Sequence, residues 1–216
     1  MTRLVGNSSM SRRLSGLAAA LFMTLALLAA PADAASASAA DTVHRFYEAL
    51  LTTMRNGPSL GQQGRFKTLE PAVDRAFDLD YMTRMAVGPA WADLPAAQRQ
   101  RLIDAFGRYV TATYADRFDS YSGEKLQVTG EQPYGAGVVV NSRIVKSNGE
   151  PITINYLMRR SGDKWQIADI YLTGTISELA TRRSEFSSVL RREGPDGLIN
   201  LLNHKADMLV ASSARS

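Results

Sequence analysis

The sequence predicts an α+β protein in which helices come first, an antiparallel β-meander of about four strands follows, and further helices end the chain. Apolar residues recur every three or four positions before residue 120 and again after residue 175, as on one face of a helix. Between them the apolar period falls to two, which is typical of strands. Tight-turn signals at Asn148-Gly149 and Ser161-Gly162-Asp163 join the last three strands. These observations predict six to seven helices around one sheet.

The first 34 residues have the pattern of a cleaved signal peptide. Three arginines precede an apolar run over residues 14–30, and Ala32-Asp33-Ala34 forms a small-x-small cleavage site before Ala35. An uncleaved anchor is the rival interpretation, because the run is about as long as a short membrane helix. Both ordinary and twin-arginine export remain open. We expect a flexible leader at 35–40, a single domain at 41–211 and a frayed tail at 212–216.

Composition excludes several classes of protein. The 216 residues contain no cysteine, which excludes disulfides and thiolate chemistry, and the net charge is +4. Removing residues 1–34, which hold three arginines and one aspartate, leaves 22 basic and 20 acidic residues, a charge of +2. Nucleic-acid binding needs clustered positive charge, so this even balance argues against it.

The first helix is predicted from an N-cap at Asp41 to a stop at Asn56-Gly57-Pro58. Residues 59–64 are expected to form a loop, and a short helix is expected to start near Pro71. Another helix is predicted from Asp78 or Asp80 to Gly88. Leu94-Pro95 opens the longest helix, whose apolar face runs to Phe118.

The predicted sheet begins after Gly123 with an edge strand that contains Leu126 and Val128. Strands at 138–145, 152–160 and 165–172 complete the meander. In the third strand, Ile152, Ile154, Tyr156 and Met158 alternate with more polar residues, so one of its faces should be apolar. Residues 175–178 have capping-box spacing and start a helix that ends at Gly194, after which Pro195 restarts it.

The sequence offers little catalytic apparatus. His44 and His204 are expected to be partly buried packing residues, and the chain has no pattern typical of a metal site or a cofactor site. Asp80 and Asp169 are the carboxylates that an enzyme could use, although a salt bridge to arginine would also explain an aspartate on a strand. We therefore expect no enzyme activity, no metal and no cofactor.

Flexible and aromatic apolar residues gather where the sheet should face the helices. Such residues either fill a core or line an apolar cavity, since methionine adapts to varied ligands and tyrosine adds a polar tip. Composition does not decide between the two. The candidate lining residues are Phe77, Tyr81, Met82, Met85, Phe106, Tyr109, Val110, Tyr114, Val140, Ile154, Tyr156, Met158 and Ile170.

Several stretches resemble the MlaC-type (toluene-tolerance auxiliary) family. They are residues 77–82 (FDLDYM), 117–124 (RFDSYSGE), 174–177 (GTIS), 183–186 (RSEF) and 194–199 (GPDGLI), and the similarity spans about residues 42–203. The 118–124 and 174–177 stretches are most similar to the hopanoid-associated member, HpnM. The resemblance implies a sheet like that of nuclear transport factor, helices clasped over it, and an apolar cavity between them.

The family resemblance also implies a function. Its members are periplasmic carriers that hold phospholipid acyl chains, or here a hopanoid, and exchange them with an inner-membrane MCE-domain ABC transporter and an outer-membrane lipid-transfer complex. The resemblance assigns no catalytic residues to this chain. Two alternatives stay open: a non-carrying adaptor of a lipid or hopanoid transport complex, with a filled core, and a small lyase or isomerase that uses Asp80 or Asp169.

Overall fold

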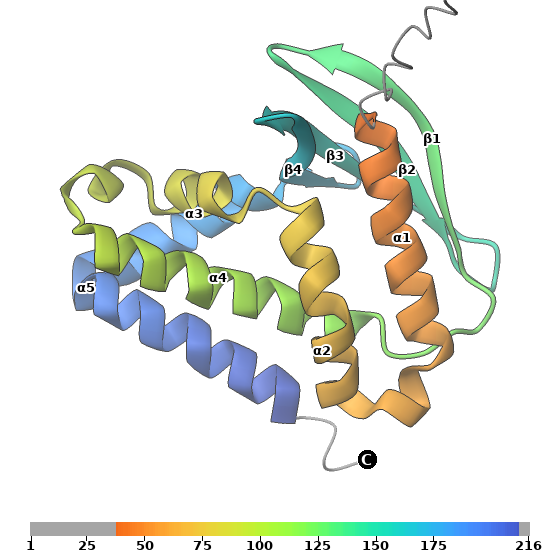
Figure 1. Cartoon of the computed structure of the whole chain (residues 1–216), viewed down its shortest axis with the longest axis horizontal. Coiled ribbons are helices and arrows are strands. Elements are labelled where there is room, and N and C mark those ends of the chain that lie inside the picture. Colours follow the sequence, from red (N-terminus) through yellow and green to blue (C-terminus); the bar gives the residue numbers. More distant parts are fainter. Residues whose placement is uncertain (1–37, 212–216) are drawn as a thin grey trace, which may run out of the picture. The chain divides into compact units, whose positions relative to one another are not determined.

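A curved antiparallel sheet and the helices packed on it make up the computed structural model, which describes residues 38–211 (Figure 1). These residues belong to one compact unit. The described chain contains, in order, α1 (Ala39–Arg55), α2 (Gly57–Ala76), α3 (Leu79–Val87), the 3₁₀ helix η1 (Gly88–Asp93), α4 (Ala96–Arg117), β1 (Lys125–Tyr134), β2 (Gly137–Val145), β3 (Pro151–Ser161), β4 (Lys164–Leu172), β5 (Ile176–Ser177) and α5 (Glu178–Ala211). The predicted α+β class is confirmed, but over 38–211 the counts are five strands and five α-helices rather than about four and six to seven. The likeness to nuclear transport factor stays a prediction.

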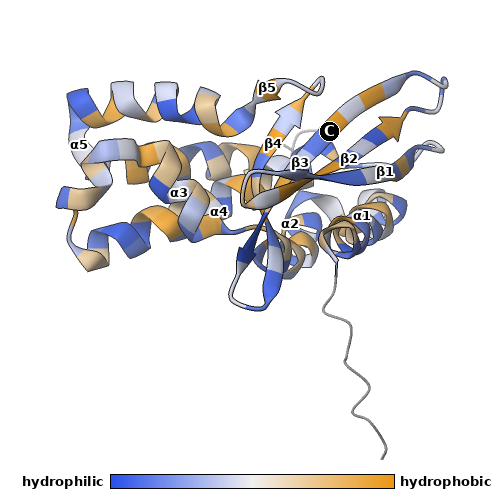
Figure 2. Ribbon diagram, turned by 90° about the horizontal axis from the view of Figure 1, so that it is seen from above, coloured by the Kyte–Doolittle hydropathy of each residue, from blue (hydrophilic) through white to orange (hydrophobic). Residues whose placement is uncertain are grey.

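The sheet has the simple order β1-β2-β3-β4-β5, with every neighbouring pair antiparallel. The predicted meander is therefore confirmed, and the added strand is the two-residue β5, which pairs with the end of β4. Helices α1 and α2 lie against the sheet, while α3, α4 and α5 pack on one another beside β4 (Figure 2). The space between β3, β4 and these last helices holds the site described below.

The ends of α1 differ slightly from the prediction. The helix begins at Ala39 with Ser38 as its N-cap: the Ser38 hydroxyl accepts from the Asp41 N–H at 3.0 Å, and Asp41 accepts from the Ser38 N–H at 2.8 Å. Asp41 is therefore the third residue of a capping box rather than the cap. Residues 39 and 40, expected in the leader, are helical. The predicted signal peptide, most of the leader and the tail lie outside the described residues.

Helix α2 covers a predicted loop and a predicted helix start, so both predictions are wrong. Residues 59–64, expected as a loop, are helical except at Gly61, whose φ of 58° kinks the helix, and Pro71 lies inside the helix instead of starting one. Gly57 allows the start of α2 to touch the backbone before β1, because a Cβ there would lie 1.8 Å from the Asp119 carbonyl oxygen. The break in apolar spacing at 59–64 thus marks a kink.

A buried arginine joins α2 to α4. The Arg65 guanidinium, 6% exposed, donates to the Ala115 carbonyl at 2.9 Å, the Gly57 carbonyl at 3.1 Å and the Gln62 side-chain oxygen. Within residues 38–211 no carboxylate lies at ion-pair distance from it. Its charge is therefore balanced by peptide dipoles, including the negative C-terminal end of α4.

The start and the middle of α5 depend on short polar and glycine signals. Gly194, with φ of 67°, breaks the helix where the sequence predicts an end and a restart. The predicted capping residue Thr175 lies two positions early: the Ser177 hydroxyl accepts from the Ala180 N–H at 2.9 Å. Thr175 instead lies in the turn before β5, and Ile176 belongs to β5, which pairs with β4.

Candidate functional site

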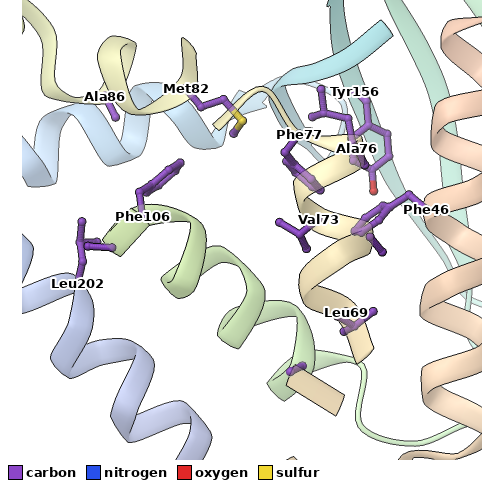
Figure 3. Close-up of a cluster of buried hydrophobic side chains, with 14 of the residues drawn as sticks. Phe46, Leu69, Val73, Ala76, Phe77, Met82, Ala86, Phe106, Tyr156 and Leu202 are labelled. Carbon is purple, nitrogen blue, oxygen red and sulfur yellow. The ribbon is translucent and has the colours of Figure 1, made fainter. Parts of the chain in front are cut away.

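A hydrophobic core of buried side chains joins α1, α2 and the sheet, continues to α3, α4 and α5, and forms one wall of the site. The Phe77 ring meets Phe46 edge-on at 5.1 Å between ring centroids, and Tyr156 reaches toward the same cluster from β3 (Figure 3). The Asp78 N–H donates to the Ile167 carbonyl at 2.9 Å, which fixes the α2–α3 junction on β4. Phe77 is therefore held firmly between core and sheet.

Beside this core lies a partly open cavity of about 380 Å³, within the range of about 300–1,000 Å³ usual for small-molecule sites. The long helix α4 gives one face, since its lining residues follow three- and four-residue spacing. Strands β3 and β4 give the opposite face through the cross-strand pairs Tyr156–Ile170 and Ile154–Leu172. The full lining is Phe77, Met82, Phe106, Tyr109, Val110, Thr113, Tyr114, Arg117, Phe118, Ile152, Ile154, Tyr156, Ile170, Leu172, Thr173, Glu178, Leu179 and Arg182.

The structure brings most of the sequence-predicted lining residues together around this cavity. These are Phe77, Met82, Phe106, Tyr109, Val110, Tyr114, Ile154, Tyr156 and Ile170. Four others lie elsewhere. Val140 and Met158 are buried in the core and are not among the residues that line the cavity. Met85 lines a separate surface depression with Trp91 and Arg183.

Tyr81, the fourth, is not in the cavity lining either. Its ring lies beneath two guanidinium groups, 4.4 Å from Arg159 and 5.6 Å from Arg84. Arg159 also donates to Asp78 at 2.5 Å, and Asp78 in turn accepts from the Tyr81 N–H at 3.0 Å as the N-cap of α3. Tyr81 therefore belongs to a surface cluster that anchors α3 to β3.

The sequence reasoning missed the charged and polar lining. Arg117 and Thr173 are exposed, so the cavity meets solvent beside them. Arg182 is held between Glu185 at 3.0 Å and Glu178 at 3.4 Å, and its guanidinium lies 5.4 Å from the Tyr109 ring centroid. Burial acts to raise the pKa of Glu185, but hydrogen bonds from Lys205 and Arg182 outweigh it and hold that pKa below its usual value. The opening therefore carries an ordered set of opposite charges.

Neither of the two carboxylates considered for catalysis lies in the cavity lining. Asp80 is exposed on α3. Asp169 is 7% exposed and accepts from the Ser177 hydroxyl at 2.6 Å, the Leu179 N–H at 3.0 Å and the Ile170 N–H at 2.7 Å. It thus ties β4 to the start of α5, in place of the expected arginine salt bridge. His44 and His204 are both exposed, so their prediction as partly buried residues is wrong.

This bonding predicts a large difference between the two aspartates. Asp169→Ala leaves partly buried donors at the start of α5 unpaired and should lower the free energy of unfolding by about 2–3 kcal/mol. Asp80→Ala, the matched control, should change it by less than about 1 kcal/mol. Urea denaturation of both variants measures this. Equal effects of the two substitutions would contradict the capping role of Asp169.

The fold and the cavity define a class: an α+β protein with an apolar, ligand-sized space between a sheet and a helical layer. The family described as MlaC protein matches residues 44–204, which is most of the chain. The chain belongs to the MlaC family. None of the helices described here is long and apolar enough to span a membrane.

Two relatives show what similar proteins do. The phospholipid-binding protein from Ralstonia solanacearum, solved in complex with a phospholipid, is 27% identical with a TM-score of 0.70, covering 80% of this chain and 99% of that one. The intermembrane phospholipid transport system binding protein MlaC of Haemophilus influenzae is 26% identical over 138 residues. That match covers 62% of this chain and 64% of the relative, so this chain spans slightly less than two thirds of its length.

Proposed function

We propose that this protein is a periplasmic lipid carrier, a soluble auxiliary component of an ABC-type lipid transport system, with no enzymatic activity. The observation that carries the proposal is the partly open cavity of about 380 Å³, lined mainly by apolar side chains of α4, β3 and β4. A non-carrying adaptor would have a filled core, so the cavity favours the carrier. The phospholipid bound by the Ralstonia relative and the transport role of the Haemophilus relative support it.

The proposed ligand is a phospholipid whose acyl chains occupy the cavity. A hopanoid is the alternative cargo, suggested by the resemblance of residues 118–124 and 174–177 to HpnM. The residues proposed to contact the lipid are those that the sequence predicts and that line the cavity: Phe77, Met82, Phe106, Tyr109, Val110, Tyr114, Ile154, Tyr156 and Ile170. The charged side chains at the opening suit a polar headgroup that stays near water, because Arg117 is exposed there.

Energetics explain why such a carrier would need docking partners. At about 0.8 kcal/mol per buried CH₂, some thirty methylenes give an upper bound of about 24 kcal/mol against release into water. This exceeds the practical ceiling of about 18–21 kcal/mol for non-covalent affinity, so release into solvent is negligibly slow. Transfer into a bilayer or another apolar cavity exchanges similar environments. We therefore propose direct docking on an inner-membrane MCE-domain ABC transporter and on an outer-membrane lipid-transfer complex.

Lipid that co-purifies with the protein tests this function. Protein isolated from the periplasm under native conditions should carry about one phospholipid per chain, detected by native mass spectrometry and identified after organic extraction. A pentacyclic lipid in the same extract would assign the hopanoid alternative. Repeated lipid-free preparations that also take up no lipid from phospholipid vesicles would overturn the carrier and favour the adaptor.

A further inference from the structure

A second depression lies where α3, η1 and α5 meet, apart from the cavity described above. Seven residues enclose its volume of about 330 Å³. Arg84 and Met85 reach it from α3, Trp91 from η1 and Arg183 from α5. Among the described residues that line it there is no carboxylate, so two positive charges lie beside apolar side chains with no negative charge between them.

The backbone of Gly88 gives Arg183 a defined place in this depression. Gly88 ends α3 with a φ of 72°, which favours glycine, and a Cβ there would lie only 3.3 Å from the Arg183 Nε. The guanidinium therefore lies over the C-terminal end of α3, where the negative end of the helix dipole favours a cation. The same turn of α3 carries Arg84, so the fold brings the two arginines to one surface.

Both guanidinium groups keep their N–H donors available for a ligand. Within residues 38–211, neither Arg84 nor Arg183 has a side-chain hydrogen bond or a carboxylate at ion-pair distance. The Arg84 guanidinium does lie over the Tyr81 ring, 5.6 Å from its centroid, which leaves the N–H groups unbonded. The acids of α3 and η1, Asp80 and Asp93, are exposed and lie outside the lining. An anion that enters the depression therefore meets two uncompensated cations.

The depression and the cavity are neighbours. On α3, Met82 lines the cavity and Met85 the depression, and on α5 the same is true of Arg182 and Arg183. Glu185, the acid next along α5, pairs with Arg182 at 3.0 Å and so belongs to the cavity side. Helices α3 and α5 thus separate the two spaces, and a partner on the depression would lie close to a lipid in the cavity.

Trp91 gives the depression the character of a membrane-interface site. Its side chain is half-buried, and within residues 38–211 its indole N–H has no hydrogen-bond partner. Arg99 holds the residue in place, since it donates to the Trp91 carbonyl at 3.1 Å and lies 5.7 Å from the ring centroid. Tryptophan is enriched at membrane–water interfaces, where its ring contacts apolar groups and its N–H stays wet.

We propose that this surface docks the protein on a bilayer that contains anionic phospholipid. Arg84 and Arg183 bind lipid phosphates, because a guanidinium makes charge-assisted hydrogen bonds to phosphate oxygens, and Trp91 enters the headgroup region. Seven lining residues are few beside the about 20–30 on each side of a standard protein interface, which favours a bilayer over a protein partner. The inference goes beyond lipid carriage, since docking does not depend on the cavity.

Binding to vesicles tests the docking surface. The purified protein should sediment with vesicles of phosphatidylcholine and phosphatidylglycerol, less so at high salt, and hardly at all with phosphatidylcholine alone. In Trp165→Phe protein, Trp91 is the single tryptophan, so its emission should shift to the blue on anionic vesicles and be quenched by brominated lipid. No sedimentation with anionic vesicles at low salt, or sedimentation with unchanged Trp91 emission, would overturn the inference.

Matched variants locate the effect. Arg84→Gln and Arg183→Gln should each weaken binding to anionic vesicles about fivefold, and together about 25-fold, since an arginine at an anionic surface contributes about 1 kcal/mol. Arg143→Gln combined with Arg192→Gln removes the same charge from exposed positions outside the depression and should change binding by less than about twofold. Equal losses in the two double variants would show a general charge effect and overturn the docking surface. Circular dichroism verifies the fold of each variant.

Ile154→Trp separates docking from lipid carriage. It narrows the cavity and should leave vesicle binding unchanged, whereas the Arg84→Gln/Arg183→Gln protein should still co-purify with lipid. A protein that carries lipid but does not bind anionic vesicles would overturn the docking surface and leave the carrier function standing. A protein that binds these vesicles through Arg84 and Arg183 but never holds lipid would overturn the carrier function alone.

Discussion

Ile154→Trp is expected to weaken lipid binding by roughly 50-fold without unfolding the protein. Ile154 is half-buried on β3, lines the cavity and pairs with Leu172, which lines it as well. An indole at this position would take the room of about three ligand methylenes, which at about 0.8 kcal/mol each costs about 2.4 kcal/mol of binding. Titration of purified protein with a fluorescent phospholipid measures the change, and circular dichroism verifies the fold.

Met85→Trp is the matched control for this prediction. The sequence places Met85 among the cavity residues, but the structure places it in a separate depression beside Trp91. The same bulky substitution there should leave lipid affinity within about twofold of the wild type. A folded Ile154→Trp protein that binds lipid normally, or equal losses in both variants, would show that the cavity is not the lipid site.

The second large effect is a steep loss of stability in alkali. Burial raises the pKa of Tyr47, Tyr114 and Tyr156 in the folded protein, whereas the unfolded chain has phenols that titrate near pH 10. Their contribution to stability is therefore fully present below about pH 10 and is lost as pH rises toward the native values. Each tyrosine lowers the free energy of unfolding by up to about 1.4 kcal/mol per pH unit, so together they give about 4 kcal/mol per unit.

We expect cooperative unfolding within about one to four pH units above pH 10, because a domain of this size has only about 5–15 kcal/mol of stability. Denaturant titrations at a series of pH values give the slope, and near-ultraviolet tyrosinate absorbance follows the phenols. Tyr156→Phe should reduce the slope by about one third. A stability that stays constant up to pH 12, or buried phenols that ionise near pH 10 in the folded protein, would contradict the prediction.

Regular spacing explains why the sequence predicts much of the cavity. Phe106, Tyr109, Val110 and Tyr114 recur every three or four residues, so one face of α4 follows directly from the pattern. The alternation of Ile154 and Tyr156 likewise identifies the inward face of β3. Such periods say which side of an element is buried, and on these elements that side is the cavity wall.

Spacing does not predict the cavity residues where neighbouring positions on a helix face different surroundings, or where the position along a strand decides which residues reach the cavity. On α3, Met82 and Ala86 are four residues apart and buried, whereas Tyr81 and Met85 form the adjacent stripe and face other surroundings. Met158 lies on β3 with Tyr156 but in the filled core, because alternation fixes the face and not how far along it the cavity extends. Thr173, Glu178 and Arg182 come from a turn and a helix start, where no apolar period points to a ligand.

The hydrogen bond between Tyr47 on α1 and Ser142 on β2 has a consequence for the order of folding. Each hairpin of the sheet joins neighbouring segments and can close quickly, but Tyr47 and Ser142 are 95 residues apart in sequence. Closing loops of that size costs entropy before any contact repays it, so we expect α1 to dock on the sheet after the hairpins form. The cavity, whose walls come from α4, β3 and β4, is complete only when the sheet and the helical layer have come together. The proposed lipid binding is therefore a property of the finished tertiary structure, and folding intermediates that contain only the sheet should lack it.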